Sequence, residues 1–285
     1  MGNRGIAMAK ITAYTILTPG HVFPFVPILF GLRERGHTVL FTVLTDAEQP
    51  SEVAGIETRA ARWNAHLSDF ASYGERLAHI LEQFIAEERP DLILVDPALW
   101  GGMVAAEASG LPWVSLAHNP KLFRGRGVDI RGPGFRPPRG ILGRLWHRFL
   151  EAGVRMMDAR YVGTMNAVRA ARGLPPVTQT WDIFHVPPLT IATTAEPFEY
   201  PRTDWHSSIR FVGPMLWEPP APAPSWIEQL DERPVVLLVG SSIPEVGKAR
   251  SWVSIALDAL ADEPYQVIAT LPTDPIPERL PSNVR

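Results

Sequence analysis

The chain has 285 residues, 46% of them hydrophobic and 20% charged, which fits a globular protein of about two domains of roughly 100–200 residues each. The formal net charge of -3, without a basic block, argues against a nucleic-acid partner. Cysteine is absent, which excludes disulfides and thiolate metal sites.

Short apolar runs alternate with helical patterns through the first part of the chain. In chain order, we expect a strand at 11–17, a helix at 22–35, strands at 38–43 and 56–60, a helix from Ser68 to 88, a strand at 92–95, a helix at 101–109 and a strand at 113–116. This alternation predicts an α/β fold with a doubly wound parallel sheet. The continuous apolar strands agree, because such a sheet is buried on both faces.

Residues 121–140 interrupt this pattern, because they are rich in arginine, glycine and proline and show no periodicity. We expect a long loop there, which is either a lid or binding loop or a disordered segment. One or two amphipathic helices are predicted at 141–172, followed by strands at 189–193 and 209–212.

Prolines then cluster at 214–234, where we expect a linker with a short helix at 226–230. The strand–helix pattern restarts after it, with strands at 235–239 and 265–270 and a helix at 246–261. We therefore predict a Rossmann-like domain at 1–213, a linker at 214–234 and a partial second Rossmann-like domain at 235–285.

His21 follows the first strand and comes just before the first long helix. Ligands of open α/β sheets bind where strands end and helices begin, so this imidazole is placed to meet a substrate. The partial positive charge of a helix N-terminus disfavours the imidazolium, which makes His21 a candidate general base. The alternative is that His21 is a solvated turn residue or a helix cap.

Asp96 ends the strand at 92–95. In a sheet of strand order 3-2-1-4-5 the first and fourth strands are neighbours, so the loops that carry His21 and Asp96 share one crevice. A carboxylate beside a histidine fixes its tautomer and stabilises the imidazolium. The alternative is that Asp96, which precedes Pro97, caps the following helix.

Several cofactor motifs are missing. The turn after the first strand lacks the glycine fingerprint of nicotinamide and flavin sites, which argues against an unrelated dinucleotide-binding protein. The chain has no Walker A sequence and no Asp-x-Asp pair, and its histidines lack the H-x-x-x-H spacing of a zinc site. We expect neither a cofactor nor a metal.

Four segments together resemble a known family. Gly20-His21-Val22-Phe23-Pro24, Gly36-His37-Thr38-Val39, residues 90–96 and Phe211-Val212-Gly213-Pro214 are similar to the UDP-glycosyltransferase superfamily, with the bacterial macrolide and antibiotic glycosyltransferases as the nearest subgroup. The tail of the chain, from 267–270 through 280–285, is similar to that subgroup too. The resemblance covers nearly the whole chain in register.

The resemblance implies the GT-B fold, in which an N-terminal domain takes the acceptor and a C-terminal domain takes a UDP- or dTDP-sugar. It implies that His21 is the base, that Asp96 orients it, and that transfer to an acceptor hydroxyl proceeds with inversion and without metal. Four aromatic residues, which could equally be ordinary core or surface residues, are candidates to line the site of a small hydrophobic hydroxylated acceptor. These are Phe23, Trp100, Phe123 and Trp146. The candidate donor residues are Gly240, Ser241 and Ser242, where the family usually has Ser-x-Gly-Ser/Thr.

The family's His- and Gly-rich diphosphate segment has no counterpart before Arg285. We therefore expect the chain alone to hold UDP or dTDP only at about millimolar affinity, and its partial domain to favour self-association. The alternative function is a non-catalytic acceptor-binding subunit, or a fragment that works with a separate donor-binding half. Without a transmembrane or signal segment, we expect no stable membrane insertion and a cytoplasmic location.

Overall fold

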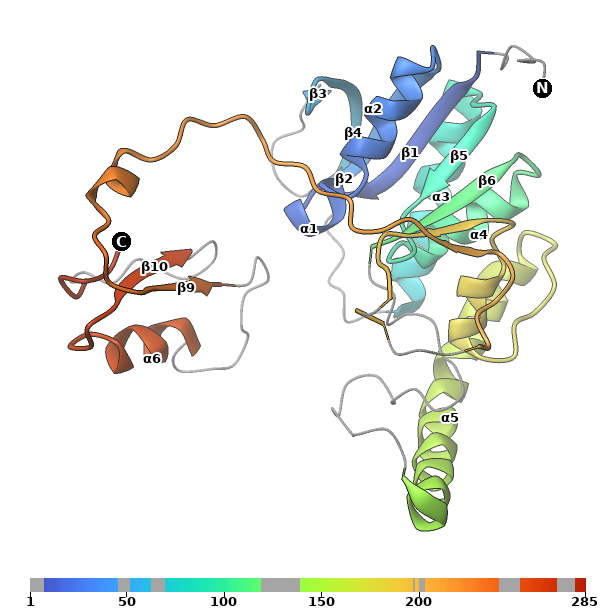
Figure 1. Cartoon of the computed structure of the whole chain (residues 1–285). Coiled ribbons are helices and arrows are strands. Elements are labelled where there is room, and N and C mark those ends of the chain that lie inside the picture. The colour runs from blue at the N-terminus through green and yellow to red at the C-terminus, as the bar shows by residue number, and fades with distance from the viewer. Residues whose placement is uncertain are drawn as a thin grey trace. The chain divides into compact units, whose positions relative to one another are not determined.

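The computed structural model describes residues 8–45, 52–62, 70–118, 139–196, 198–199, 203–240, 252–270 and 280–285 (Figure 1). The chain divides into two compact units, each described here by itself. The first holds Met1–Leu17 and His21–Glu218, and the second holds Thr18–Gly20 and Pro219–Arg285. Among the helices of the described ranges, none combines the length and the apolar character that crossing a membrane would require.

The first unit is built on an eight-stranded sheet of order β3-β4-β2-β1-β5-β6-β7-β8. Its strands are β1 (Lys10–Ile16), β2 (Thr38–Thr45), β3 (Glu52–Val53), β4 (Ile56–Arg62), β5 (Leu92–Val95), β6 (Trp113–Ala117), β7 (Thr190–Ala192) and β8 (Ile209–Phe211). All neighbouring pairs are parallel except β3 with β4. The predicted doubly wound sheet is confirmed, and the sequence missed only the two-residue β3.

The helices of this unit are α2 (Val26–Glu34), α3 (Phe70–Glu88), α4 (Trp100–Ala108) and α5 (Gly140–Ala170), with a 3-10 turn η2 at Thr180–His185. The short helix α1 (Pro19–Val22) is divided between the units, because only its last two residues belong to the first. The predicted segment 141–172 is thus a single helix. Residues 119–138, which include most of the predicted long loop, and Ser68 lie outside the described residues.

The helix predicted at 22–35 is present as α2, but it begins four residues later than predicted, because a separate short helix, α1, ends just before it. α1 ends at Val22 and α2 begins at Val26. Pro24 has no N–H to donate and disfavours helical torsion angles in the residue before it, so the helix stops. Pro27 is tolerated because it lies in the first turn of α2, where the amide has no helical acceptor.

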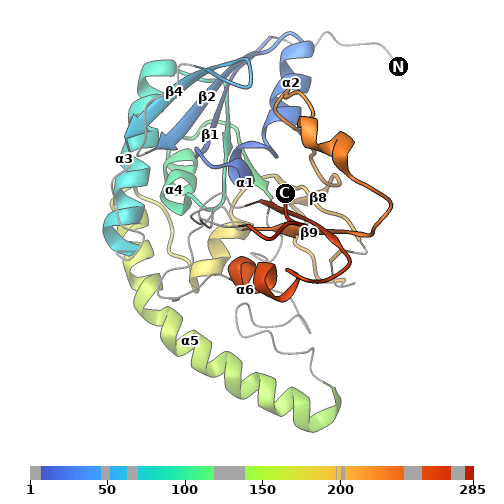
Figure 2. The same cartoon turned by 90° about the vertical axis from the view of Figure 1, so that its left-hand side faces the viewer.

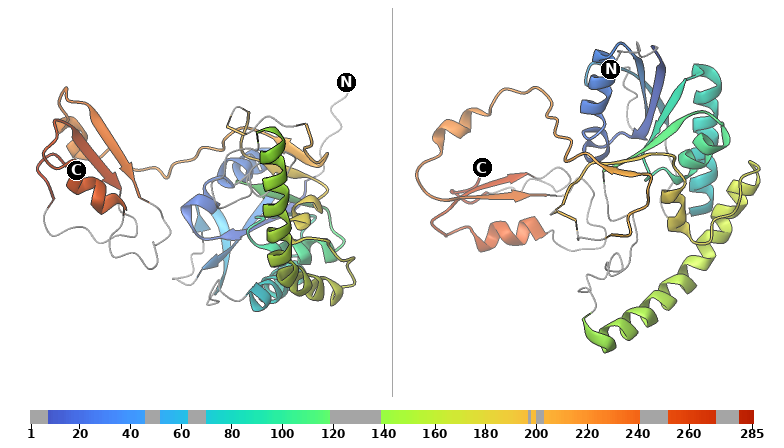
Figure 3. Two further views of the ribbon diagram at one scale, coloured as in Figure 1. Left: turned by 90° about the horizontal axis from the view of Figure 1, so that it is seen from below. Right: turned by 45° about the vertical axis from the view of Figure 1, so that its right-hand side comes forward.

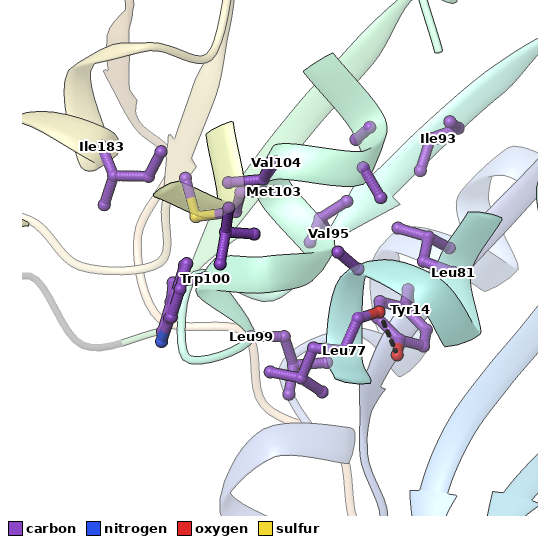
Figure 4. Packing of buried hydrophobic residues seen from close by; sticks show 14 of the residues in the cluster. Tyr14, Leu77, Leu81, Ile93, Val95, Leu99, Trp100, Met103, Val104 and Ile183 are labelled. Atoms are coloured by element: carbon purple, nitrogen blue, oxygen red, sulfur yellow. Dashed lines mark hydrogen bonds between the residues drawn. The ribbon is translucent and has the colours of Figure 1, made fainter. Parts of the chain in front are cut away.

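The core lies on both faces of the sheet. Tyr14, Ile93 and Val95 point to the face that α3 and α4 cover, whereas Ala13 and Leu94 point to the face that α2 covers. Figure 2 shows α2 and α3 on opposite sides of the strands. Figure 4 shows the first face, where the Tyr14 hydroxyl lies 3.4 Å from the Leu77 carbonyl. This alternation along each strand is the expected consequence of a pleat with a period of two.

Helices α3 and α4 approach each other through two glycines. A Cβ on Gly101 would lie 2.0 Å from the carbonyl oxygen of Gly74, and a Cβ on Gly74 would lie 1.8 Å from the Trp100 ring. Neither position leaves room for a side chain. The close approach packs the start of α4 directly against α3.

The last turns of α5 are tied to α4 by a buried ion pair. Arg169, whose side chain is 1% exposed, makes two hydrogen bonds to the Glu107 carboxylate, at 2.6 and 3.0 Å, and a third to the Pro175 carbonyl. The N-terminal part of α5 instead extends away from the sheet, as the right-hand view of Figure 3 shows. The ion pair therefore anchors one end of a helix whose other end projects.

Glu107→Ala should lower the free energy of unfolding by about 3–5 kcal/mol, because it leaves the buried Arg169 guanidinium without its counter-charge. Urea unfolding followed by circular dichroism measures the change. Glu87→Ala is the matched control, since Glu87 forms an exposed pair with Arg59 and should shift stability by less than about 0.5 kcal/mol. Equal effects of the two variants would show that the buried pair contributes no more than a surface pair.

The second unit contains the parallel pair β9 (Val235–Val239) and β10 (Gln266–Thr270), the helix α6 (Trp252–Ala259) and the 3-10 turn η3 (Ser225–Gln229). Leu238 packs against Val253, Leu257 and Val267, whereas Val235, Leu237 and Val239 on the same strand are exposed. The predicted strands at 235–239 and 265–270 are confirmed. Self-association through this unit stays a prediction, as do the predicted domain boundaries.

Candidate active site

The carboxyl ends of three neighbouring parallel strands bring four polar side chains together. Thr15 lies near the end of β1, His21 lies in α1 after it, Asp96 directly follows β5, and His118 directly follows β6. β5 pairs with both β1 and β6, so these side chains meet at one edge of the sheet. Ligands of open α/β sheets bind at this edge.

Asp96 is the centre of this cluster and is fully buried. Its Oδ2 accepts hydrogen bonds from the Thr15 hydroxyl at 2.7 Å and from the His21 ring at 2.6 Å, while its Oδ1 accepts one from the Ala98 amide at 2.8 Å. The two predicted contacts of Asp96, as a cap of the following helix and as a partner of His21, are therefore both present. One carboxylate oxygen caps the turn before α4, and the other binds the histidine.

The Nδ1 atom of His21 makes the contact with Asp96, and the side chain remains 24% exposed. The expected contact between the two side chains is thus present. An ionised carboxylate can only accept, so Nδ1 carries the hydrogen, and in the neutral ring Nε2 has the lone pair. Nε2, the ring nitrogen that does not contact Asp96, is therefore the atom of His21 that can accept a proton.

His118 lies against both members of this pair. Its ring meets the His21 ring edge-on, with centroids 4.3 Å apart, and its Nδ1 is 3.9 Å from Asp96 Oδ1. That nitrogen is buried without a hydrogen-bond partner in the described structure. Burial lowers the pKa of His118, and the nearby His21 adds to this, against the opposing effect of Asp96. His118 is therefore a neutral imidazole with an unused nitrogen.

Tyr73 of α3 binds the turn between Asp96 and α4. Its hydroxyl donates to the Ala98 carbonyl at 3.2 Å, so Ala98 binds Tyr73 through its carbonyl and Asp96 through its amide. Burial, with a smaller contribution from the Asp96 charge, raises the pKa of Tyr73 to about 12. The phenol stays protonated at neutral pH and can keep donating this hydrogen bond.

The four candidate acceptor aromatics lie in different environments. Phe23 is half-buried, with its ring edge-on to Trp217 at 5.0 Å, and Trp146 is 55% exposed on α5. Trp100 is 5% exposed in the core and stacks on Phe70 at 4.8 Å, and its role in an acceptor site stays a prediction. Its flat ring fills the space that Gly74 leaves, which only the helix packing could reveal. Phe123 lies outside the described residues.

Of the three candidate donor residues, only Gly240 is described, and Ser241 and Ser242 lie outside the described residues. The Gly240 amide donates to the Thr270 carbonyl at 3.0 Å and lies 3.2 Å from the Thr270 hydroxyl. This amide is therefore engaged within the second unit. A donor role for this turn stays a prediction that must rest on other groups of the same loop.

Sequence reasoning missed Thr15 and His118. No sequence signal marks Thr15, because it is one of several threonines in apolar strands. His118 did carry a signal, since it directly follows a predicted strand, as Asp96 does. The histidine spacing used to argue against a zinc site considered neighbours along one helix only. It could not detect His21 and His118, which the sheet order brings together.

Comparison with known proteins gives two informative relatives, whereas no family model matches the chain. The chain is 29% identical over 317 residues to 4′-demethylrebeccamycin synthase of Lentzea aerocolonigenes, which covers 97% of this chain and 73% of that protein. It is 27% identical over 164 residues to oleandomycin glycosyltransferase of Streptomyces antibioticus, which covers 52% of this chain and 38% of that protein.

Solved structures of glycosyltransferases have a fold similar to that of this chain. Glycosyltransferase SnogD from Streptomyces nogalater matches with a TM-score of 0.62 and 20% identity, over 98% of this chain and 70% of that one. Glycosyltransferase VinC in complex with dTDP matches with a TM-score of 0.52 and 20% identity, over 97% and 71%. The predicted GT-B fold is confirmed by these matches.

Proposed function

We propose that this chain, which is similar to glycosyltransferases of antibiotic biosynthesis and shares the GT-B fold, is an inverting, metal-independent enzyme that transfers a sugar from a UDP- or dTDP-sugar to a hydroxyl of a hydrophobic natural product. The observation that carries this proposal is the 2.6 Å contact between His21 and the buried Asp96 at the ligand-binding edge of the sheet. A histidine held by a carboxylate is the arrangement that general-base catalysis requires.

In the proposed reaction, Nε2 of His21 removes the proton of an acceptor hydroxyl. The oxygen forms a bond to the anomeric carbon of the sugar while the bond from that carbon to the nucleoside diphosphate breaks, and the diphosphate leaves with the electron pair. Attack opposite the leaving group inverts the anomeric centre. Asp96 keeps the hydrogen on Nδ1 and stabilises the imidazolium that results. No step needs a metal ion.

The nucleotide class of the donor is supported by VinC, whose structure contains dTDP and matches 97% of this chain. In the GT-B fold, a C-terminal Rossmann-like domain takes the donor. The second unit supplies its first strand, β9, with Gly240 at the carboxyl end of that strand. Carboxyl ends of parallel strands are the usual place for such ligands.

The projecting helix α5 supports a hydrophobic acceptor. Its inner side is formed by buried residues such as His147, Asp158 and Met165, and its opposite side is apolar yet exposed. Trp146 and Phe149 stack on that side, with ring centroids 5.7 Å apart and planes at 25°. Exposed apolar faces of this kind commonly mark binding surfaces. The exposed residues are Ile141, Leu142, Leu145, Trp146, Phe149 and Met156.

Trp146→Ala should raise the acceptor KM about 10- to 150-fold and leave kcat nearly unchanged, because it removes an apolar contact worth roughly 1.5–3 kcal/mol that is made equally in the ground and transition states. A hydroxycoumarin serves as the acceptor probe in steady-state kinetics. The control is Trp252→Ala, which removes another half-exposed tryptophan, on α6. An unchanged KM in Trp146→Ala would remove this residue from the acceptor site.

The proposed function is tested by incubating the protein with UDP-glucose or dTDP-glucose and the hydroxycoumarin, with EDTA present. The expected product is a glucoside of β configuration formed from the α-linked donor, identified by mass spectrometry and by the proton coupling of its anomeric hydrogen. An α-glucoside would overturn inversion. Loss of turnover in EDTA, restored by a divalent cation, would overturn metal independence.

A further inference from the structure

His21, Asp96 and His118 offer three ligand atoms that all lie within 4.8 Å of one another. We propose that these residues form a binding site for a divalent transition-metal ion such as Zn²⁺, and that the bound ion blocks the histidine that the proposed function uses as its base. The metal site itself stands independently of the transfer reaction. Its inhibitory effect rests on the proposed function.

The donor set fits the ion. Imidazole nitrogens and a carboxylate oxygen are the ligands that Zn²⁺ takes in three-ligand sites with an open fourth position. The Nδ1 of His118 is buried and has no hydrogen-bond partner in the described structure, so its lone pair is available.

The ligand atoms lie near the spacing that the ion requires. Two ligand atoms on a tetrahedral Zn²⁺, each about 2.0–2.1 Å from the ion, lie about 3.3 Å apart. The contact between His21 Nδ1 and Asp96 Oδ2 is shorter than this, at 2.6 Å, and the contact between His118 Nδ1 and Asp96 Oδ1 is longer, at 3.9 Å. All the ligand atoms of the set lie within 4.8 Å of one another, so binding requires the side chains to draw together around the ion.

The Asp96 carboxylate already accepts hydrogen bonds of the kind that orient metal-ligating carboxylates. Thr15 donates to Oδ2 and the Ala98 amide donates to Oδ1, and the Ala98 carbonyl is in turn fixed by Tyr73. Hydrogen bonds of this outer shell orient ligating carboxylates and are part of most metal sites. Asp96 therefore does not need to be organised by the ion when it binds.

Metal binding breaks the hydrogen bond between His21 and Asp96. The ion binds the lone pair of Nδ1, so the hydrogen of the neutral ring moves from Nδ1 to Nε2. Nε2 then has no lone pair with which to accept a proton, and the pair can no longer act as base and orienting carboxylate. The ion should therefore compete with catalysis rather than assist it. Free Zn²⁺ should inhibit transfer, and EDTA should reverse the inhibition.

The test uses Co²⁺ as a spectroscopic probe for the site. Titration of the protein with Co²⁺ should give one equivalent of a visible absorption band of tetrahedral intensity, and Zn²⁺ should displace it. His118→Phe keeps a ring against His21 but removes the ligand, so it should weaken Co²⁺ binding at least about tenfold. His79→Phe is the matched control, because His79 is 66% exposed on α3 and should leave the band unchanged.

Each outcome decides the proposal. A band that survives in His118→Phe, or that is lost in His79→Phe, would overturn the site. Asp96→Asn provides a second variant should His118→Phe fail to fold, and it should also lose the band. Because absorption needs no turnover, metal binding without transfer would contradict the proposed function alone. Transfer that is insensitive to Zn²⁺, despite binding, would overturn the inhibitory role.

Discussion

His21→Ala should lower kcat by about 10²–10⁴-fold, the usual contribution of a general base, while the acceptor KM changes little. Only the proton acceptor is removed, because the Asp96 carboxylate keeps its bonds to Thr15 and Ala98. Steady-state kinetics with dTDP-glucose and the hydroxycoumarin measure both constants. His79→Ala, which removes an exposed histidine of α3, should behave as the wild-type protein.

Activity of His21→Ala within a few-fold of the wild type would mean that another group takes the proton. His118 is then the next candidate, because its ring lies 4.3 Å from that of His21. The pair of single variants separates the two cases. If His21 is the base, His118→Phe should keep far more activity than His21→Ala.

Asp96→Asn should lower kcat by about 10³–10⁴-fold, because the amide cannot stabilise the imidazolium and can donate to Nδ1, which favours the wrong tautomer of His21. The amide oxygen can still accept from Ala98, so the turn before α4 is preserved. The fold should therefore survive, as measured by thermal unfolding. A variant that melts early but retains kcat per folded molecule would leave Asp96 as a helix cap only.

The double variant His21→Ala, Asp96→Asn gives a sharper test of the same point. Residues that act as one unit are not additive, so the double variant should be hardly slower than His21→Ala alone. Thr15→Val is the control, since it removes one neutral hydrogen bond to the same oxygen and should cost about 1 kcal/mol, or roughly fivefold in kcat. Additive effects of His21 and Asp96 would show that they act separately.

The sequence by itself predicted the sheet and two members of its site. The apolar runs that became β1, β5 and β6 are continuous because each strand is buried on both faces. Their order in the sheet follows from the parallel strand–helix alternation. Since neighbouring parallel strands end at one edge, the positions of His21 and Asp96 after their strands were enough to predict that they meet.

The tertiary structure alone decided which side chains face that site and which face the core. Trp100 is turned inward because glycines let α3 and α4 approach closely, and His118 joins the site because β6 pairs with β5. Arg169 is buried where it pairs with Glu107, which lies sixty-two residues earlier in the chain and is brought close only by the fold. Strand order and helix formation follow from local composition and a few topological rules, whereas the direction of a side chain depends on packing between elements that are distant in sequence.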